Sequence, residues 1–396
     1  MTPYQLPAYS PLSIKAALAG IGALGRSGAE ARAAVLRLIA EATRGEAVVP
    51  TDSGTTALGL ALRGAAVRSD GPIVALPAYC CFDVATAADA AKARVLLYDV
   101  DPVTLGPDYD SLRRALGRGA QAVVVAHLYG IPVDVPGVRG LAAQTGELVV
   151  EDAAQGLGGY RGAQPLGTMG DVSVLSFGRG KGRTGGRGGA LVGFGQRGVS
   201  IARESSGLLG RPAVGFAELA ALVAQWLVGR PGLFGLVASL PFLGVGETRY
   251  RDVKPPRLMS GVAASVLQAT WEGAGDESGV RWRNARRLLA HVRPGGPLVP
   301  VRTSVEDNPG YLRLPVVASL AARAAVAAAR PLGVMPGYPR ALGELPRFAG
   351  RVINRDDAFP GARFLAQRLI TLPTHSRLGE PALTRLEHWM DGLDES

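Results

Sequence analysis

The sequence predicts an α/β fold, in which helices cover both faces of a mostly parallel sheet and a smaller α+β lobe follows at the C-terminus. Two observations support this. Over residues 54–200, short apolar runs alternate with helix-like stretches, a pattern typical of a parallel sheet buried on both faces. Beyond residue 260 helical patterns dominate. The expected strands are residues 73–76, 94–99, 121–127, 147–152, 172–177 and 189–194, with two short ones at 311–316 and 369–373.

Helices are expected between the first four strands and over most of the C-terminal lobe. The strands at 172–177 and 189–194 are joined by a Gly-rich loop alone, which indicates a hairpin or a bend. We expect a large domain over residues 1–246 and a small one over 247–396. In such sheets ligands collect at the carboxyl ends of strands and at helix N-termini. The expected helices lie near residues 55–67, 82–92, 108–117, 136–145, 260–292, 317–330 and 380–391.

Residues 207–246 are an apolar insertion with two runs, 219–229 and 231–246, separated by Arg230. Neither run reaches the ~18–20 residues that span a bilayer. We expect a buried or interface helical hairpin. The alternative is a peripheral contact with an anionic membrane, for which Arg211, Arg230 and Arg249 would flank the apolar surface.

The composition excludes several classes of protein. The chain has 396 residues, 47% of them hydrophobic, so it can bury a large core. Its charge of +10 comes from dispersed arginines mixed with acids, whereas a nucleic-acid site needs a clustered basic surface. The two cysteines, Cys80 and Cys81, are adjacent and can form neither a disulfide framework nor a metal cluster. Without a recognisable secretory signal, we expect a cytoplasmic protein with no metal site.

The chain has four lysines, namely Lys15, Lys92, Lys181 and Lys254. Only lysine offers an amine that can be deprotonated and made nucleophilic, so each one is a separate candidate. Lys181 stands between glycines in the loop 176–189. The loop differs at two positions from the phosphate-binding pattern G-x-x-x-x-G-K-[ST]. An Arg/Gly segment that binds nucleic acid would lie in a disordered tail, whereas this loop connects two expected strands. The third interpretation is a lysine at a strand end with space for a bulky planar ligand.

Two further features could serve the same ligand. Asp152 ends an expected strand, and an Asp in this position commonly caps the helix that follows. The alternative is a buried carboxylate that keeps the pyridine nitrogen of a bound ligand protonated. Ser53, Gly54 and Thr55 open an apolar helix, where they form either a plain N-cap or a phosphate site. Together, a phosphate turn, an acid and a lysine are the parts needed to hold pyridoxal 5′-phosphate (PLP).

Six segments resemble, in the same order, motifs of the DegT/StrS-type sugar aminotransferases, a family of PLP enzymes of fold type I. The resemblance implies that Lys181 is the Schiff-base lysine and proton shuttle, and that Asp152 is the partner of the ring nitrogen. The segments are 53–58 (SGTTAL), 77–88 (PAYCCFDVATAA), 126–134 (AHLYGIPVD), 151–159 (EDAAQGLGG), 170–181 (GDVSVLSFGRGK) and 366–378 (AQRLITLPTHSRL).

The resemblance also implies roles for other cofactor-binding residues. Gln155 would make a polar contact to the cofactor, and Phe82 would cover the ring face. Tyr79 is the alternative to Phe82, because the segment that holds both is longer than the family's usual form; core packing is the other explanation for Phe82. The phosphate would be held by Ser53, Gly54, Thr55 and Ser176.

The chain departs from the family pattern in three places. The His that commonly precedes the lysine is replaced by residues 178–180 (GRG), and the frequent Glu after the lysine loop is Arg187. The Asn-Tyr-Arg segment that reaches the neighbouring subunit's cofactor corresponds to 248–251 (TRYR) and lacks its Asn. Arg249 or Arg251 could bind the phosphate across a dimer instead, or be a surface arginine.

We therefore expect a homodimeric PLP-dependent aminotransferase with active sites at the interface. It would move an amino group from a glutamate-like donor to a keto group on a nucleotide-linked sugar. In related dehydratases histidine replaces the lysine, so Lys181 favours amino transfer. The alternatives are an aminotransferase for a non-sugar or lipid-linked ketone at a membrane surface, and a PLP-binding regulator without turnover.

Overall fold

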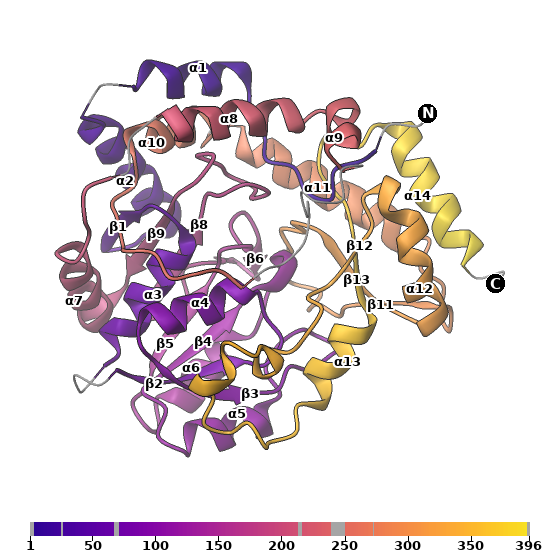
Figure 1. Cartoon of the computed structure of the whole chain (residues 1–396). Coiled ribbons are helices and arrows are strands. Elements are labelled where there is room, and N and C mark those ends of the chain that lie inside the picture. The colour runs from indigo at the N-terminus through magenta and orange to yellow at the C-terminus, as the bar shows by residue number, and fades with distance from the viewer. Residues whose placement is uncertain are drawn as a thin grey trace.

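The computed structural model describes residues 4–24, 27–66, 71–212, 216–238, 250–271 and 273–393. A seven-stranded sheet with the order β1-β9-β8-β5-β4-β2-β3 lies at the centre of the N-terminal half (Figure 1). Its strands are parallel except for β9, which pairs antiparallel with both of its neighbours. The strands are β1 (Ala47–Thr51), β2 (Ile73–Pro77), β3 (Arg94–Tyr98), β4 (Ala122–Ala126), β5 (Leu148–Asp152), β8 (Val172–Ser176) and β9 (Gly189–Gly193).

Helices cover both faces of this sheet, which confirms the predicted α/β fold. Val74 and Leu76 of β2 belong to the hydrophobic cluster that contains α3 and α4 side chains, whereas Ala75 belongs to the cluster of α5 and α6. Alternate residues of a strand point to opposite faces, so a strand buried on both sides is apolar at nearly every position. The helices are α3 (Gly54–Gly64), α4 (Phe82–Ala90), α5 (Tyr109–Leu116) and α6 (Val135–Ala142).

The strands β8 and β9 form an antiparallel hairpin whose register runs from Val172↔Gly193 to Ser176↔Gly189, so the hairpin interpretation is confirmed. The edge strand β1 was not predicted. It contains Pro50, which interrupts the apolar pattern, and a proline is tolerated there because the strand lies at the edge of the sheet.

A second sheet has four strands in the order β10-β11-β13-β12, with antiparallel pairing throughout. Two of them correspond to the strands expected at 311–316 and 369–373. The expected domain boundary, 246–247, lies in residues 239–249, outside the described residues, and stays a prediction. The strands are β10 (Leu298–Pro300), β11 (Leu314–Ala318), β12 (Met335–Pro336) and β13 (Leu369–Leu372), while β6 (Tyr160–Arg161) and β7 (Gln164–Pro165) form a separate short pair.

The apolar insertion forms α8 (Phe216–Val228) and α9 (Pro231–Ala238), which meet at Arg230 as predicted. Residues 213–215 and 239–246 of the insertion lie outside the described residues. Helix α8 packs beside α1 (Ile14–Gly22), and the two run side by side in Figure 1. Among the described helices, none has both the length and the apolar character needed to cross a bilayer.

The remaining helices surround the two sheets. The helices expected in the C-terminal part are present, but the stretch 260–292 forms two helices, α10 and α11, instead of one. Four helices were not predicted, namely α1, α2, α7 and α13. These helices are α2 (Ala29–Thr43), α7 (Gly195–Ser206), α10 (Gly261–Trp271), α11 (Ala274–Leu289), α12 (Leu320–Ala329), α13 (Pro360–Arg368) and α14 (Glu380–Gly392).

Candidate functional site

A cavity of about 1000 Å³ brings most of the predicted site residues together. Its wall is formed by the N-terminal segment 6–10, the turn before α3, the loop between β8 and β9, and the inner side of α8. The predicted residues that line it are Ser53, Gly54, Thr55, Ser176 and Lys181. Asp152, Gln155 and Phe82 lie outside this lining.

The turn 53–55 is the N-terminus of α3. The Ser53 hydroxyl accepts a hydrogen bond from the Thr56 N–H at 3.1 Å and donates one to Thr56 Oγ1 at 3.0 Å, so Ser53 does cap the helix. The N–H groups of Gly54 and Thr55 belong to the first turn of α3, where a helix provides no acceptor of its own. These two N–H groups and the positive end of the helix dipole face the cavity and suit a phosphate.

Close packing makes this turn a cradle. A Cβ atom on Gly54 would lie 2.8 Å from the Ser176 Cβ and 3.1 Å from its Oγ. The turn therefore leaves the Ser176 hydroxyl next to the helix N-terminus only because residue 54 has no side chain. Ser176 is the last residue of β8 and is half-buried.

Lys181 lies in the loop that closes the β8–β9 hairpin. The loop is held by hydrogen bonds from the Phe177 N–H to the Gly188 carbonyl and from the Gly185 N–H to the Phe177 carbonyl, each 2.9 Å. Gly180 has φ = +82° and donates its N–H to Ser10 Oγ at 2.8 Å. Lys181 is half-buried, and its amine forms no hydrogen bond or ion pair within the described part of the chain. It is thus free to react with a ligand in the cavity.

Asp152 ends β5, and its Oδ1 accepts the Ala154 N–H at 3.0 Å. Burial raises the pKa of the Asp152 carboxyl, while the Ala154 N–H and the positive charge of Lys181 oppose that rise. Residues 154–158 form turns, so the helix-cap interpretation of Asp152 is wrong. The role of Asp152 as the partner of a cofactor ring nitrogen stays a prediction.

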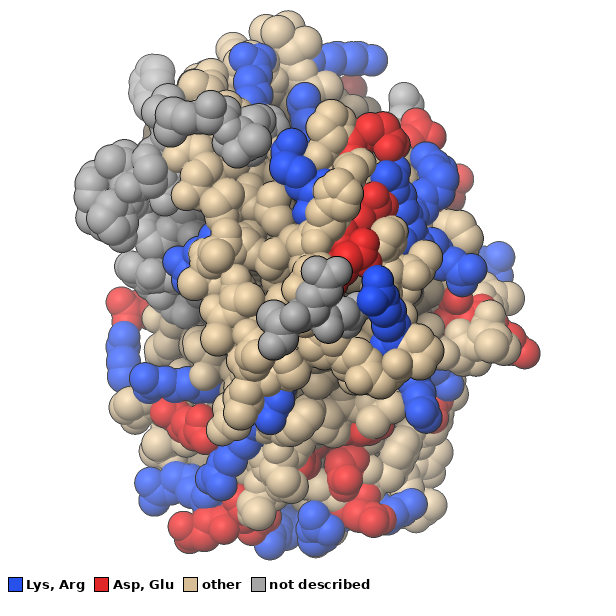
Figure 2. Space-filling model, turned by 90° about the vertical axis from the view of Figure 1, so that its right-hand side faces the viewer, with Lys and Arg blue, Asp and Glu red and all other residues tan. Residues whose placement is uncertain are grey.

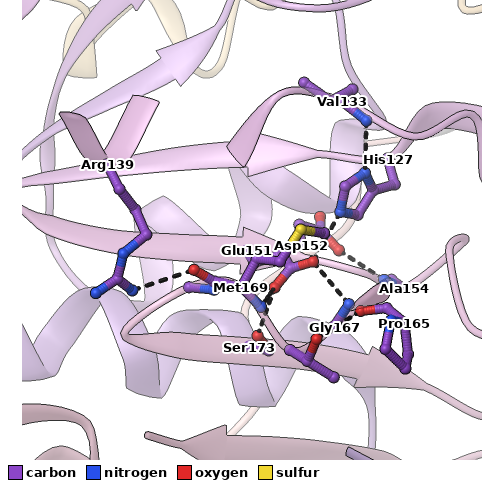
Figure 3. Close-up of polar contacts among 12 residues, drawn as sticks. His127, Val133, Arg139, Glu151, Asp152, Ala154, Pro165, Gly167, Met169 and Ser173 are labelled. Carbon is purple, nitrogen blue, oxygen red and sulfur yellow. Dashed lines mark hydrogen bonds and ion pairs between the residues drawn. The ribbon is translucent and has the colours of Figure 1, made fainter. Parts of the chain in front are cut away.

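A buried pair behind Asp152 fixes the end of β5. His127 Nδ1 accepts the Val133 N–H at 3.1 Å, which makes Nε2 the protonated nitrogen, and Nε2 donates to Glu151 Oε1 at 2.9 Å (Figure 3). Burial opposes the ionisation of Glu151, but the bonds from His127 and from backbone N–H groups prevail and lower its pKa. Glu151 also accepts from the N–H groups of Gly167, Met169 and Gly170 and from the Ser173 hydroxyl.

Gln155 joins the β5 end to the C-terminal sheet. Its Oε1 accepts the Tyr129 N–H at 3.1 Å, and its Nε2 donates to Tyr338 Oη at 2.9 Å. The rings of Tyr129 and Tyr338 stack with a centroid distance of 5.6 Å. Both ends of the Gln155 amide are thus already bonded within the protein, so its contact to a cofactor stays a prediction.

The two aromatic candidates for the ring face are both buried. Phe82 begins α4 and belongs to the large hydrophobic cluster, and Tyr79 accepts the Tyr338 N–H on its hydroxyl at 2.8 Å. Neither lines the cavity, and their roles stay predictions. Between them, burial raises the pKa of the Cys81 thiol to about 12 and that of Cys80 well above its ordinary value. Neither thiol is therefore a nucleophile at neutral pH.

The arginines noted as departures have different positions. Arg249 lies outside the described residues. Arg251 lines the cavity and is largely exposed, with its Nε 3.9 Å from Asp83 Oδ1. Arg187 also lines the cavity, and its Nε lies 4.0 Å from Glu218 Oε1 on α8. Figure 2 shows Lys and Arg interspersed with Asp and Glu on the face that it presents.

Arg313 lines the same cavity and was missed by the sequence analysis. Its guanidinium donates to the carbonyls of Gly333 and Thr371 at 3.1 and 2.9 Å, and its Nε is buried without a partner. Among the described residues, no acid forms an ion pair with it. Burial lowers its pKa to about 10. One feature of the sequence could have pointed to Arg313: it is the single charged residue of an apolar run, between Leu312 and Leu314.

Comparisons with known proteins agree with the motifs. Residues 28–202 match the model of the DegT/DnrJ/EryC1/StrS aminotransferase family. UDP-N-acetyl-3-dehydro-alpha-D-glucosamine 3-aminotransferase of Acidithiobacillus ferrooxidans is 34% identical over 125 residues, which are 32% of this chain and 34% of that protein. L-glutamine:2-deoxy-scyllo-inosose aminotransferase of Streptoalloteichus tenebrarius is 34% identical over 144 residues, 36% of this chain and 34% of that protein. The chain thus matches about a third of the length of these relatives.

The fold is shared over nearly the whole chain. The crystal structure of the aminotransferase TlmJ from Streptoalloteichus hindustanus matches with a TM-score of 0.76 and 21% identity, covering 98% of both chains. This likeness shows that the chain shares the α/β fold of that aminotransferase. The similarity in sequence to the DegT/DnrJ/EryC1/StrS aminotransferase family, which the order of the motifs predicted, extends over residues 28–202 of the chain.

Proposed function

We propose that the chain is a PLP-dependent aminotransferase that transfers an amino group from a glutamate-like donor to a keto group on a nucleotide-linked sugar. One observation carries the proposal: the free amine of Lys181 shares a cavity with Gly54 and Thr55 at the N-terminus of α3, and its charge acts on the buried Asp152 carboxyl. A lysine, an anion cradle and a buried acid are the groups that PLP enzymes use.

The residues present fit this cofactor. The N–H groups of Gly54 and Thr55 and the Ser176 hydroxyl would hold its phosphate, where the missing Cβ of Gly54 leaves the space. The Asp152 carboxylate would pair with the ring nitrogen. When bound, PLP supplies an electron sink that stabilises negative charge on the substrate carbon next to nitrogen.

Lys181 would do the proton transfers. A general base must be within hydrogen-bond reach of the proton that it takes, and a lysine amine released from the cofactor would remain in the cavity. Its two neighbours in the loop, Gly180 and Gly182, carry no side chain that could compete with the amine for space in the cavity. Asp152, anchored by Ala154 N–H and by the neighbouring Glu151–His127 pair, would stay in place during these steps.

Arg313 would bind the carboxylate of the amino donor. It is buried, it lines the cavity and no acid of the described chain neutralises it. A planar guanidinium forms paired hydrogen bonds with a carboxylate, which makes it selective for that group. This supports a glutamate-like donor.

The acceptor is inferred from charge and from relatives. Arg179, Arg251 and Lys254 line the cavity and would suit a diphosphate. Among the relatives, one is named for a UDP-sugar and another for 2-deoxy-scyllo-inosose with L-glutamine as donor. A homodimer in which Arg251 reaches the partner's site belongs to the same proposal.

Absorption spectroscopy tests the function. Protein reconstituted with PLP should show a visible band that shifts when glutamate or glutamine is added, and Lys181→Ala should abolish the band and turnover. A colourless protein that cannot be reconstituted would contradict the cofactor. A band shift without turnover of any keto-sugar nucleotide, cyclitol ketone or simple ketone would instead support a regulator.

A lipid-linked acceptor is the second candidate, because α1 exposes Ile14 and Leu18 at 62% and 59% beside α8. Exposed apolar helices with flanking basic residues such as Arg211 and Arg230 are typical of membrane-surface contacts. Flotation with anionic liposomes would support this candidate, whereas the absence of co-migration would exclude it.

A further inference from the structure

Helix α8 turns its polar side chains toward the cavity, beside apolar ones such as Leu222, and exposes other apolar side chains on its outer side. Its only charged or amide side chains are Glu218 and Gln225, and both line the cavity. They are seven residues apart, which places them on the same face of the helix, two turns from one another. On the outer side, Val223 and Leu227 are 38% and 39% exposed. In an ordinary surface helix, polar side chains such as these two would lie on the solvent side.

Both polar side chains have a buried atom without a partner in the described part of the chain. The Glu218 side chain is 7% exposed; its Oε1 accepts from the Ser260 hydroxyl, while its Oε2 is buried and unpaired. The amide nitrogen of Gln225 is likewise buried and unpaired. Unpaired buried polar atoms are uncommon, and each calls for an explanation such as a bound ligand.

The helix is packed directly on the loop that carries Lys181. A Cβ atom on Gly186 would lie 2.9 Å from Leu222 Cδ1 and 3.8 Å from Gln225 Oε1. A ligand that touches the inner face of α8 therefore lies in the same chamber as the lysine amine. Burial also raises the pKa of the Glu218 carboxyl, against the effects of Ser260 and Arg187.

We propose that Glu218 and Gln225 form an acceptor-binding subsite that recognises the hydroxyl groups of a polyhydroxylated ring ketone. This rests on the proposed aminotransferase function and adds the part of the acceptor that the chain recognises. An acceptor hydroxyl donates to Glu218 Oε2, and another ring oxygen accepts from Gln225 Nε2. A phosphate does not fit here, because a carboxylate repels it. A hydroxylated ring fits, because each hydroxyl both donates and accepts.

The pair also accounts for one departure from the family pattern. The acid that is frequent after the lysine loop is Arg187 in this chain. The structure places the Glu218 carboxylate 4.0 Å from the Arg187 Nε, so an acid reaches the same wall of the cavity from α8. The apolar insertion thus contributes to acceptor specificity.

The test compares ring ketones with and without hydroxyl groups. Holoenzyme with glutamine as donor is assayed with 2-deoxy-scyllo-inosose, with UDP-N-acetyl-3-dehydroglucosamine and with cyclohexanone. The wild type should prefer a hydroxylated ketone at least about 100-fold in kcat/KM. In Glu218→Gln and Gln225→Met, the KM for that ketone should rise about 10-fold to 100-fold, because each loses one hydrogen bond to the substrate.

Val223→Thr, a substitution of similar size on the outer face of α8, is the matched control and should leave the acceptor KM unchanged. Equal effects of all three variants would mean a structural role and would overturn the subsite. It is also overturned if the wild type accepts cyclohexanone equally well, if it accepts neither hydroxylated ketone, or if Glu218→Gln and Gln225→Met keep the wild-type KM.

The donor half-reaction separates this proposal from the function on which it rests. This half-reaction is measured as the change in the visible absorption band when glutamine is added to the holoenzyme, and it needs no acceptor. If the wild-type band does not respond, the aminotransferase function fails. If it responds and the acceptor kinetics of the variants do not change, only the subsite fails.

Discussion

Gly54 and Ser176 lie so close together that a Cβ atom on Gly54 would come within 2.8 Å of the Ser176 Cβ. The contact joins the N-terminus of α3 to the end of β8, two segments that are far apart in the sequence. It sets the width of the proposed phosphate cradle, because Ser176 cannot withdraw without shifting the strand that it ends.

Gly54→Ala should therefore disturb this cradle. The added methyl group needs space that the packed turn does not have, and such overpacking costs about 1–3 kcal/mol. We expect PLP to bind at least about 10-fold more weakly, measured by titration of the apoprotein. Gly140→Ala on α6 is the control, since its Cβ would meet no atom within 4 Å; unchanged affinity in Gly54→Ala would refute the cradle.

Glu151→Gln should destabilise the fold. The carboxylate accepts five hydrogen bonds while fully buried, and an amide would direct its own N–H groups at those donors. A loss on the order of 3 kcal/mol in the free energy of unfolding is expected from urea denaturation. The exposed substitution Glu41→Gln should change it by less than about 0.5 kcal/mol.

The same variant has a defined pH dependence. Because the pKa of Glu151 is lowered in the folded protein, its ionised form stabilises the fold above the ordinary carboxyl pKa, and this contribution is lost as the pH falls through the folded value. The difference between wild type and Glu151→Gln should consequently shrink in acid. A difference that is constant with pH would contradict ionised Glu151.

Arg313→Met should separate donor binding from stability. The substitution removes a buried charge that has no acidic partner, which offsets the loss of the two hydrogen bonds to the Gly333 and Thr371 carbonyls, so the thermal unfolding temperature of the apoprotein should change little. The KM for glutamate should rise about 10-fold to 100-fold, as expected for the loss of a charged hydrogen bond. An unchanged KM for glutamate would exclude Arg313 as the carboxylate ligand.

His375 should make the fold sensitive to mild acid. Burial lowers its pKa from 6.5 to about 4, with its Nε2 donating to the Leu6 carbonyl at 2.8 Å. The unfolded chain takes up the proton first, so stability is present above pH 6.5 and decreases as the pH falls toward 4, by on the order of 3 kcal/mol. His375→Gln should lack this component in pH-dependent urea denaturation, whereas exposed His388→Gln should keep it.

The strands of the central sheet were predictable because burial on both faces leaves an apolar run with few interruptions. The predicted runs 73–76 and 172–177 differ from β2 and β8 by a single residue. Strand β1 could not be found in this way, since Pro50 breaks its pattern and its place at the sheet edge depends on pairing with β9. Local sequence does not contain that information.

The candidate site was predictable where chemistry is local. The lysine between glycines and the small residues before α3 are visible in the sequence, and the structure places them around one cavity. Arg313 and Glu218 were missed for a different reason. Their importance comes from one buried atom in each side chain, Arg313 Nε and Glu218 Oε2, that has no partner among the described residues after folding, and this depends on contacts with segments far away in the chain.

The N-terminal segment that lines the cavity has a consequence for biosynthesis. The Leu6 carbonyl accepts from His375, 369 residues further along the chain, and the Tyr9 carbonyl accepts from Arg281. Synthesis proceeds from the N-terminus, and domains generally begin to fold as they emerge. This wall cannot be completed until residue 375 has left the ribosome, so the nascent chain should acquire its ligand affinity only after that point of translation.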